Sequence, residues 1–286
     1  MQHSFCVIRF SKEFNEETEQ ARSIKGGKCL KALTAIALEG FPYVKSGDNV
    51  ASMIVETAEK NGVKIEDEDV VVVAQKIVSK AENRVVKLKD AVPSQRAREI
   101  AKTTGKSPKF VELILKETKS IIKASHEVLL VEDKRGLVCI NAGIDKSNVE
   151  DRGSLVLLPE NPDASAEKCR AEIKNLTGKS VAVIVCDTYS RPFRRGQVNF
   201  AIGVAGIELF RDYRGKRDLF GQILKVKNVA VVDEIAAAAE LLMGQAKEAV
   251  PVVILKGLKE TVEFCEECGM SGLAISREED LFKDAL

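Results

Sequence analysis

Residues 181–196 read VAVIVCDTYSRPFRRG, and this stretch contains the clearest pattern in the chain. An apolar run that begins at Val181 leads directly to Asp187 and Thr188. Such a run predicts a strand over 181–187 that is buried on both faces of a sheet. Since functional residues gather at the carboxyl ends of strands in α/β sheets, Asp187 is the first candidate for a catalytic side chain. A carboxylate that only caps the next turn is the alternative that these residues leave open.

The segments on either side alternate between strand-like and helix-like patterns. Apolar runs predict further strands at 70–73, 127–133, 136–143, 198–207, 222–232 and 250–257. Helical spacing of apolar residues predicts helices at 50–62, 93–105, 107–120, 166–176 and 234–243. We expect N-caps at Ser107, Ser165 and Asp233, and Gly244 just after the last helix. Together these elements predict an α/β protein of mixed α+β type.

The domain organisation follows from charge and periodicity. Residues 1–32 are highly charged and lack a clean period, so we expect an N-terminal extension there. Residues 33–286 form the expected catalytic unit, without internal repeats or low-complexity linkers. The 286 residues are 45% hydrophobic and 30% charged, which fits one large or two small folded domains and excludes a disordered chain.

The overall charge restricts the class of partner. A formal net charge of +1 offers no global field for nucleic acid or a membrane surface. No apolar run approaches the roughly 20 residues that a membrane-spanning helix needs. The first residues lack the basic, apolar and small-residue order of a signal peptide, so we expect a cytoplasmic protein.

The cysteines point to the same compartment. Seven cysteines, an odd number scattered along the chain, favour a reducing environment over a disulfide framework. Cys265 and Cys268 form a CxxC motif, which we interpret as two ordinary thiols on a helical turn. A zinc site is the alternative, but neither His3 nor His126 has ligand spacing.

Arginines follow Asp187 closely. Guanidinium groups such as Arg191 and Arg194 bind phosphate and carboxylate oxygens in a bidentate manner. From Arg191 to Lys227 the chain has nine basic and three acidic residues, which favours a small polyanionic ligand. RNA is a weaker reading, because the chain has three tyrosines, no tryptophan and no RNA-binding motif. Solvated arginines remain the other interpretation.

Three further segments carry polar side chains next to apolar runs. Asp145 and Asn148 could supply a metal ligand and a nucleotide contact, or form only an Asx-type turn. Gln245 could donate an oxygen to a metal, although a plain helix end explains the same residues. Lys76 and Lys80 follow a predicted buried strand and could meet a phosphate or lie on a solvated face.

Several familiar nucleotide motifs are absent. GKS occurs at 105–107 and 178–180, but a P-loop needs a glycine five residues earlier, where the chain has Ile100 and Ile173. No GxGxxG supports a Rossmann dinucleotide site. Asp187 also lacks the second aspartate of a haloacid-dehalogenase-type phosphatase.

Seven blocks of the sequence, in order, resemble the coenzyme F-420:L-glutamate ligase family. The similarity extends from about residue 35 to the end, and seven ordered blocks are more specific than any single motif. The blocks are ALEGFPYVKSGDN (37–49), VVVVAQKIVSKAENR (70–84), GLVCINAGIDKSNVE (136–150), LLPENPDASA (157–166), VIVCDTYSRPFRRGQVNFAIGVAGI (183–207), RDLFGQILKVKNVAVVDEIAAAAELLMGQ (217–245) and VPVVILKG (250–257).

The resemblance implies an activity and a partner set. Ligases of this family attach L-glutamate to the terminal carboxylate of a deazaflavin phosphodiester precursor, and add further glutamates by γ-linkage. GTP is hydrolysed to GDP and phosphate, Mn²⁺ or Mg²⁺ is required, and K⁺ helps. An acyl phosphate on the acceptor would turn a poor electrophile into a reactive one. The family fold is unusual and two-lobed, and the subunits form an intertwined homodimer.

The resemblance also implies residue roles. Metal ligation falls on Asp145, Asp187, Thr188 and Gln245. Contacts to the guanine nucleotide fall on Leu38, Glu39, Gly40, Phe41, Gln75, Lys76, Lys80, Asn148, Met243 and Gly244. Arg191 and Arg194 could hold the substrate phosphodiester or the transferred phosphoryl group.

The sequence departs from the family at three positions near Asp187. We expect threonine, glycine and tryptophan where this chain has Cys186, Ser190 and Phe193. These changes could alter the acceptor pocket, so the same chemistry on a folate is a competing reading. A non-catalytic nucleotide- or deazaflavin-binding protein is a third, although binding alone need not retain a complete set of metal ligands.

Overall fold

The computed structural model describes residues 7–9, 32–149, 151–266, 268–270, 272–276 and 278–281. Most of the expected N-terminal extension therefore lies outside the described residues. Within these ranges the chain is mixed α/β, with six α-helices and several sheets. Among the described helices, none combines the length and the apolar composition that a membrane crossing requires.

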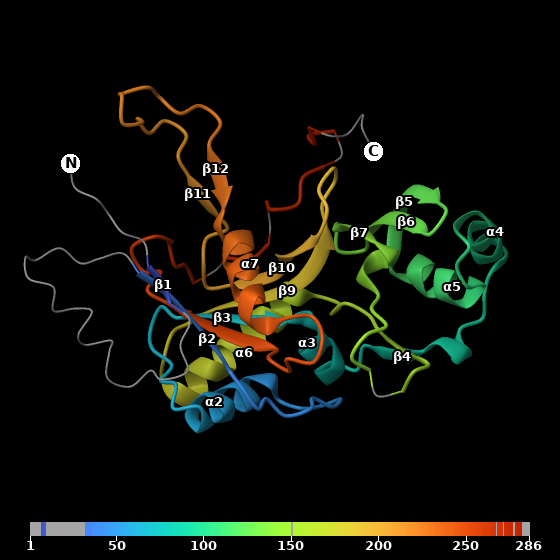
Figure 1. The fold of residues 1–286 in the computed structure, drawn as a ribbon, viewed down its shortest axis with the longest axis horizontal. Helices are drawn as coiled ribbons and strands as arrows, with labels where there is room; N and C mark the ends of the chain where they lie inside the picture. Colours follow the sequence, from blue (N-terminus) through green and yellow to red (C-terminus); the bar gives the residue numbers. More distant parts are fainter. Residues whose placement is uncertain are drawn as a thin grey trace, which may run out of the picture.

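A six-stranded sheet forms the centre of the molecule (Figure 1). Its strand order is β1 (Val7–Arg9), β2 (Ala32–Ala37), β13 (Val252–Lys256), β3 (Val70–Ala74), β9 (Ala182–Ser190) and β10 (Gln197–Ala205). The β3–β9 and β1–β2 pairs are parallel, whereas β13 is antiparallel to both of its neighbours and β10 is antiparallel to β9. Strands β2, β3 and β9 therefore run in the same direction.

Helices cover both faces of this sheet. On one face, α2 (Val50–Lys60), α3 (Gln75–Ala81) and α6 (Pro162–Thr177) pack against alternate valines of β3 and β9. On the other face, α7 (Val231–Met243) packs against the intervening residues of the same strands. All four valines of β3 are buried, because the strand is covered on both faces, as its unbroken apolar run predicts.

A second group of elements has its own hydrophobic core. Helices α4 (Gln95–Thr104) and α5 (Pro108–Glu117) pack on β5 (Thr118–Ser125), β6 (Val128–Asp133) and β7 (Val138–Ile140), at one end of the molecule (Figure 1). The single turns η1 (Leu88–Asp90) and η2 (Asn141–Gly143) and the short pair β4 (Val85–Lys87) and β8 (Ser154–Val156) connect this group to the central sheet.

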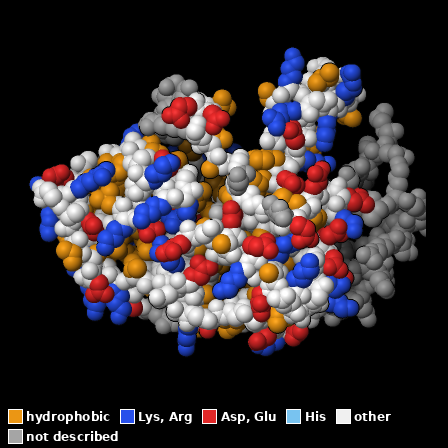
Figure 2. All heavy atoms as spheres, turned by 180° about the vertical axis from the view of Figure 1, so that it is seen from behind, with side chains coloured by type: hydrophobic (Ala, Val, Ile, Leu, Met, Phe, Trp, Pro, Cys, Tyr) orange, Lys and Arg blue, Asp and Glu red, His pale blue; other side chains and the backbone are white. Residues whose placement is uncertain are grey.

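A long hairpin leaves the sheet after β10. Its base is the antiparallel pair β11 (Phe210–Asp212) and β12 (Asn228–Ala230), and residues 213–227 form the connecting loop. We call residues 210–230 the arm; Figures 1 and 2 show it projecting from the body of the molecule. The arm exposes large apolar side chains, with Leu219 and Phe220 at its tip and Val226 nearer its base.

Most predicted elements are confirmed, but two predicted N-caps are wrong. Helix α6 begins at Pro162, where the Asn161 side chain accepts a hydrogen bond from the Ala164 N–H at 3.1 Å, and Ser165 lies inside the helix. Asp233 lies inside α7, and its carboxylate instead accepts the Ala201 N–H of β10 at 3.0 Å. Ser107 does occupy the N-cap position of α5, without a side-chain capping bond.

Two strand predictions and one helix prediction also change. The predicted strand at 222–232 is largely the loop of the arm, because only Asn228–Ala230 pairs with another strand. The predicted helix at 107–120 ends at Glu117, where the chain enters β5. Strand β9 continues past Asp187 to Ser190, because β10 pairs with it along that length.

Candidate functional site

The candidate residues meet at one edge of the central sheet. Strands β2, β3 and β9 run in the same direction, so their carboxyl ends lie at the same edge. The loop that precedes β13 reaches this edge from the opposite direction. Backbone hydrogen bonds fix the alignment, from Leu38 N–H to Val252 O at 3.0 Å and from Ala74 N–H to Pro251 O at 2.8 Å.

Asp187 lies just beyond the level at which β3 ends. Ala74 is aligned with Cys186, so the next residue of β9 faces the start of α3 on one side and β10 on the other. Burial, together with the charge of Asp145, raises the pKa of Asp187 from 3.8 to about 6. The Thr188 N–H and the charge of Lys76 oppose this rise. Nearby positive charge, such as that of Lys76, therefore favours the ionised form of Asp187.

Lys76 connects the start of α3 to a segment distant in sequence. Its Nζ lies 2.7 Å from Asp145 Oδ2 and donates to Ser147 Oγ at 2.7 Å. Burial acts to raise the pKa of Asp145, but the hydrogen bonds from Lys76 and Ser147 outweigh it, so the pKa lies below its usual value. Lys80, one turn along α3, donates to the Asn148 carbonyl at 2.9 Å.

The Asx-type turn predicted around Asp145 is confirmed. The Ser147 N–H donates to Asp145 Oδ1 at 2.7 Å, which is an Asx-type turn. The same carboxylate also lies in the cluster that contains Lys76 and Asp187. Gln75 contributes to this cluster as well: its amide opposes the rise in the pKa of Asp187, and its Oε1 accepts from Ser79 at 2.8 Å.

Thr188 and Gln245 are in direct contact. Gln245 Nε2 donates to Thr188 Oγ1 at 2.8 Å, although the two residues are 57 positions apart. Two residues that the sequence analysis missed complete this group. Asn199 on β10 lies opposite Thr188 in the register, and Glu240 on α7 accepts from both Asn199 and Gln245. A signal was present: Glu240 is the one acid beyond the first turn of an alanine-rich helix, shortly before Gln245.

These side chains suit a hard divalent cation. The carboxylates of Asp145, Asp187 and Glu240 all feel the charge of Lys76, which acts to lower the pKa of each. Three acids that share one ammonium group leave an excess of negative charge at neutral pH. Carboxylate, hydroxyl and amide oxygens are the donors that Mg²⁺ and Mn²⁺ prefer. The donor set at this edge therefore fits either ion.

The predicted nucleotide-binding residues lie along the same edge. Leu38 is buried directly after β2, and Gly40 has a φ of +70° in the turn that follows. Met243 and Gly244 end α7 just before the loop that carries Gln245. Leu38 and Asp187 are separated by three strand spacings, or about 14 Å. A single ligand that contacts both must lie along the edge.

The arginines lie further from this cluster. Arg191 and Arg194 occupy the turn between β9 and β10, with Arg191 about 13 Å along the chain from Asp187. Arg191 Nη2 donates weakly to the Arg195 carbonyl at 3.5 Å, and Arg194 is exposed. The basic residues from Arg211 to Lys227 lie on the arm, where Arg214 pairs with Asp212 at 2.7 Å. The basic stretch is thus divided between two projecting hairpins.

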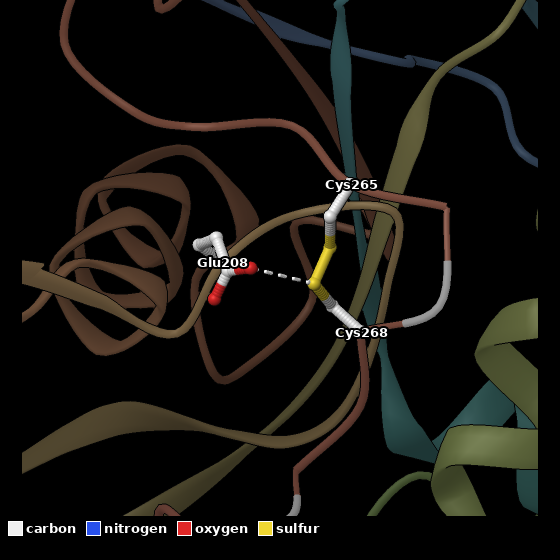
Figure 3. Close-up of side chains that lie close together, drawn as sticks. All are labelled: Glu208, Cys265 and Cys268. Atoms are coloured by element: carbon white, nitrogen blue, oxygen red, sulfur yellow. Dashed lines mark hydrogen bonds between the residues drawn. A yellow bond between two sulfur atoms is a disulfide. The ribbon is translucent and has the colours of Figure 1, made fainter.

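The prediction of two ordinary thiols on a helical turn is wrong. Cys265 and Cys268 form a disulfide in an irregular segment, with Cα atoms 5.9 Å apart (Figure 3). The bridge between Ile207 and Phe264 holds this segment beside Glu208, whose Oε1 lies 3.2 Å from Cys268 Sγ. Since Glu208 follows the carboxyl end of β10, the group lies at the sheet edge opposite Asp187.

Comparison with known proteins gives a consistent result. A family model described as F420-0:Gamma-glutamyl ligase matches residues 40–257. The chain is 44% identical over 251 residues to the coenzyme F420:L-glutamate ligase of Methanothermobacter thermautotrophicus, which covers 88% of this chain and 99% of that protein. The ligases of the same name from Archaeoglobus fulgidus and Methanocaldococcus jannaschii are 45% and 43% identical, over 87% and 89% of this chain and 96% and 98% of theirs.

Proposed function

The chain belongs to the F420-0:gamma-glutamyl ligase family, and on that premise we propose that it joins L-glutamate to the terminal carboxylate of the coenzyme F420 precursor. One structural observation carries the proposal. Segments separated by up to about two hundred residues, at Leu38, Lys76, Asp145, Asp187 and Gln245, meet at a single edge of the sheet.

The proposed reaction uses GTP and proceeds through an acyl phosphate. A phosphoryl group moves from GTP to the acceptor carboxylate and leaves GDP. The amine of glutamate then attacks the acyl carbon and releases phosphate, so an amide forms and GTP is hydrolysed overall. No covalent enzyme nucleophile takes part. Further glutamates would be added to the new γ-carboxylate in the same way.

The chain's own residues would bind and orient the reactants. Lys76 pairs with Asp145 and Lys80 bonds to the Asn148 carbonyl, and both lysines would hold phosphate oxygens, together with the backbone at Asn148. Gln75, Met243, Gly244 and residues 38–41 would contact the rest of the nucleotide. Arg191 and Arg194 would hold the phosphodiester of the acceptor as it enters past the β9–β10 turn.

A divalent cation belongs to the proposal. Asp145, Asp187, Thr188 and Gln245 would hold Mn²⁺ or Mg²⁺, and the donor chemistry of these side chains fits such an ion. When bound, the ion would offset the negative charge on the nucleotide phosphates. K⁺ is proposed as an additional activating ion.

We also propose a homodimer of two-lobed subunits. The separate hydrophobic core of α4, α5 and β6 supports the two-lobed description. The exposed apolar tip of the arm supports the dimer, because a contiguous group of large apolar side chains on a projecting hairpin is expected to be buried against a partner.

The competing acceptor, a folate, was suggested by three departures from the family pattern. Cys186 is buried in the core against α7, so this departure does not face an acceptor pocket. Ser190 and Phe193 lie at the β9–β10 turn, and Phe193 is 86% exposed. The positions of Ser190 and Phe193 favour neither the F420 precursor nor a folate, so the product assay decides between the two acceptors.

The test is a product analysis by mass spectrometry. The protein is incubated with GTP, Mn²⁺, L-glutamate and either the glutamate-free F420 precursor or a folate, with ATP in place of GTP as a parallel reaction. We expect one or more glutamyl residues on the deazaflavin only, with one GDP formed per residue. Glutamylation of folate alone would transfer the proposal to the other acceptor. Nucleotide binding without any product would indicate a binding protein and contradict the proposal.

A further inference from the structure

Four polar side chains form a closed ring beside the acidic cluster. The Thr188 hydroxyl donates to Asn199 Oδ1 at 2.8 Å, and Asn199 Nδ2 donates to Glu240 Oε2 at 2.7 Å. Gln245 Nε2 closes the ring by donating to Glu240 Oε1 at 2.5 Å and to Thr188 Oγ1 at 2.8 Å. Residues from β9, β10, α7 and the following loop are thus joined by four hydrogen bonds.

Glu240 is the only member of this ring that is restricted to accepting. An ionised carboxylate has no hydrogen to donate, whereas an amide offers both an oxygen and an NH₂ group of nearly the same shape. The orientation of an amide is therefore set by its partners. Because each carboxylate oxygen of Glu240 faces one amide, both Asn199 and Gln245 must turn their NH₂ groups toward it.

This restriction extends to the proposed metal ligands. With its NH₂ group directed at Glu240, Gln245 presents Oε1 on the opposite side of the amide. With its NH₂ group similarly held, Asn199 presents Oδ1 to the Thr188 hydroxyl and takes up its hydrogen. The remaining lone pair of Thr188 Oγ1 is then available to a cation. One carboxylate thus orients two neutral oxygen ligands at once.

The burial of Asn199 limits the hydrogen-bond partners that its amide can find. Asn199 is 3% exposed and lies against the sulfur atoms of Cys186 and Met243, which are weak hydrogen-bond acceptors. Its amide would otherwise be left unsatisfied in an apolar environment, which is costly. Glu240 itself has both oxygens engaged by amide donors, so its geometry is that of a residue acting through its neighbours.

We propose that Glu240 is a positioning residue that orients the Asn199 and Gln245 amides and so directs the Thr188 and Gln245 oxygens toward the divalent cation. The inference rests on the metal site of the proposed function, and it adds a residue that makes no contact with nucleotide or acceptor. Outer-shell partners of this kind typically change metal affinity by about 10- to 100-fold when removed.

The variant Glu240→Gln tests the inference with little change in shape. Its carboxamide has one oxygen and one NH₂ group, so it can accept from only one of the two neighbouring amides and forces the other to turn. We expect Mn²⁺ affinity to weaken about 10- to 100-fold. Binding is measured directly by titration of the free protein with Mn²⁺, without nucleotide or turnover. Glu234→Gln, at an exposed acid on the same helix, should bind Mn²⁺ like the unaltered protein.

A double variant separates orientation from general damage. In Glu240→Gln combined with Asn199→Asp, the new amide at 240 accepts from Gln245 and donates to the carboxylate at 199, which still accepts the Thr188 hydroxyl, so donors and acceptors match again. We expect Mn²⁺ affinity to recover most of the loss seen in the single variant. Recovery also keeps the test valid if the single variant folds poorly.

The outcomes test the metal site and the positioning role of Glu240 separately. Unaltered protein that fails to bind Mn²⁺ would overturn the metal site of the proposed function and the role of Glu240 with it. Unaltered protein that binds Mn²⁺, with an equal affinity in Glu240→Gln, would overturn the positioning role alone. A double variant as weak as the single one would likewise count against orientation as the cause.

Discussion

Asp187 is a carboxylate that the fold holds in an unfavourable environment. Burial and the neighbouring charge of Asp145 raise its pKa to about 6. Its folded-state pKa lies above the usual value of 3.8, so the metal-free protein is stabilised by protonation and loses that stability as the pH rises through about 6. At neutral pH the ionised group therefore destabilises the metal-free fold. A buried, ionised carboxylate that lowers stability is expected at a functional site, where its charge is used.

Replacement of this carboxylate should separate function from stability. In Asp187→Asn the charge is lost at nearly constant volume, so we expect turnover to fall by more than about 100-fold, beyond the range typical of a residue that only supports a ligand. The melting temperature of the metal-free variant at pH 7.5 should be unchanged or higher, because a buried charge has been removed. Product analysis and thermal unfolding measure the two effects. Asp90→Asn, at an exposed acid, is the control, and near-normal turnover of Asp187→Asn would overturn the metal assignment.

At the scale of elements, the packing of α6 on β10 positions the site strands. The register of β10 against β9 shifts between Ala201 and Gly203, which is a β-bulge. At Gly203 the backbone approaches the first residue of α6 so closely that an added Cβ would overlap the Pro162 carbonyl. The Asp163 carboxylate also accepts the Val204 N–H at 2.8 Å. The glycine thus permits a close contact between helix and sheet.

A methyl group at this contact should destabilise the protein. We expect Gly203→Ala to lower the free energy of unfolding by about 1–3 kcal/mol, because the obstacle is backbone and cannot rotate away. Gly153→Ala is the matched control, since its Cβ would meet only the Asp151 side chain at 3.5 Å, and it should change stability by less than about 0.5 kcal/mol. Urea denaturation measures the free energy of unfolding of both variants. If the two variants were equally stable, α6 could shift away from the sheet without a measurable cost, and the close contact would not matter for stability.

At the scale of the whole molecule, the arm has no core of its own. Leu219 and Phe220 are 99% and 90% exposed at its tip, and basic and apolar side chains lie side by side on the surface of the arm (Figure 2). A two-stranded hairpin with so little apolar burial is marginal in isolation. Contact with a second subunit would account for its length and for its apolar tip.

A charge at the tip should therefore dissociate the proposed dimer. We expect Phe220→Asp to convert the protein from two chains to one, because a buried carboxylate at the contact would have no partner. Light scattering after size-exclusion chromatography gives the mass of each species. Val92→Asp, at a residue that is 79% exposed elsewhere on the surface, should leave the mass unchanged. Identical masses for Phe220→Asp and the unaltered protein would exclude the arm as the dimer contact.

The sequence alone determined the elements that depend on local pattern, and with them the family. The valine run of β3 and the apolar period of α2 are local signals, so both elements lie where they were expected. Helix starts were less predictable, since Asn161 and Ser165 both carry suitable capping side chains and packing decided between them. Strands β4 and β8 were missed, because each has only three residues and pairing alone defines it. The first residues of β5 were assigned to the predicted helix at 107–120, and the rest of that strand was missed.

Local pattern gave Asp145, Asp187 and Gln245 as separate candidates, and the family resemblance implied that they share one site; only the tertiary structure shows the contacts that bring them together. The contact of Lys76 with Asp145 and that of Gln245 with Thr188 follow from the directions of strands in the sheet, which no local pattern encodes. The sequence analysis assigned no role to Glu240 or Asn199. Their importance arises from hydrogen-bond direction, and an amide or a carboxylate acquires a direction only when the fold brings it a partner.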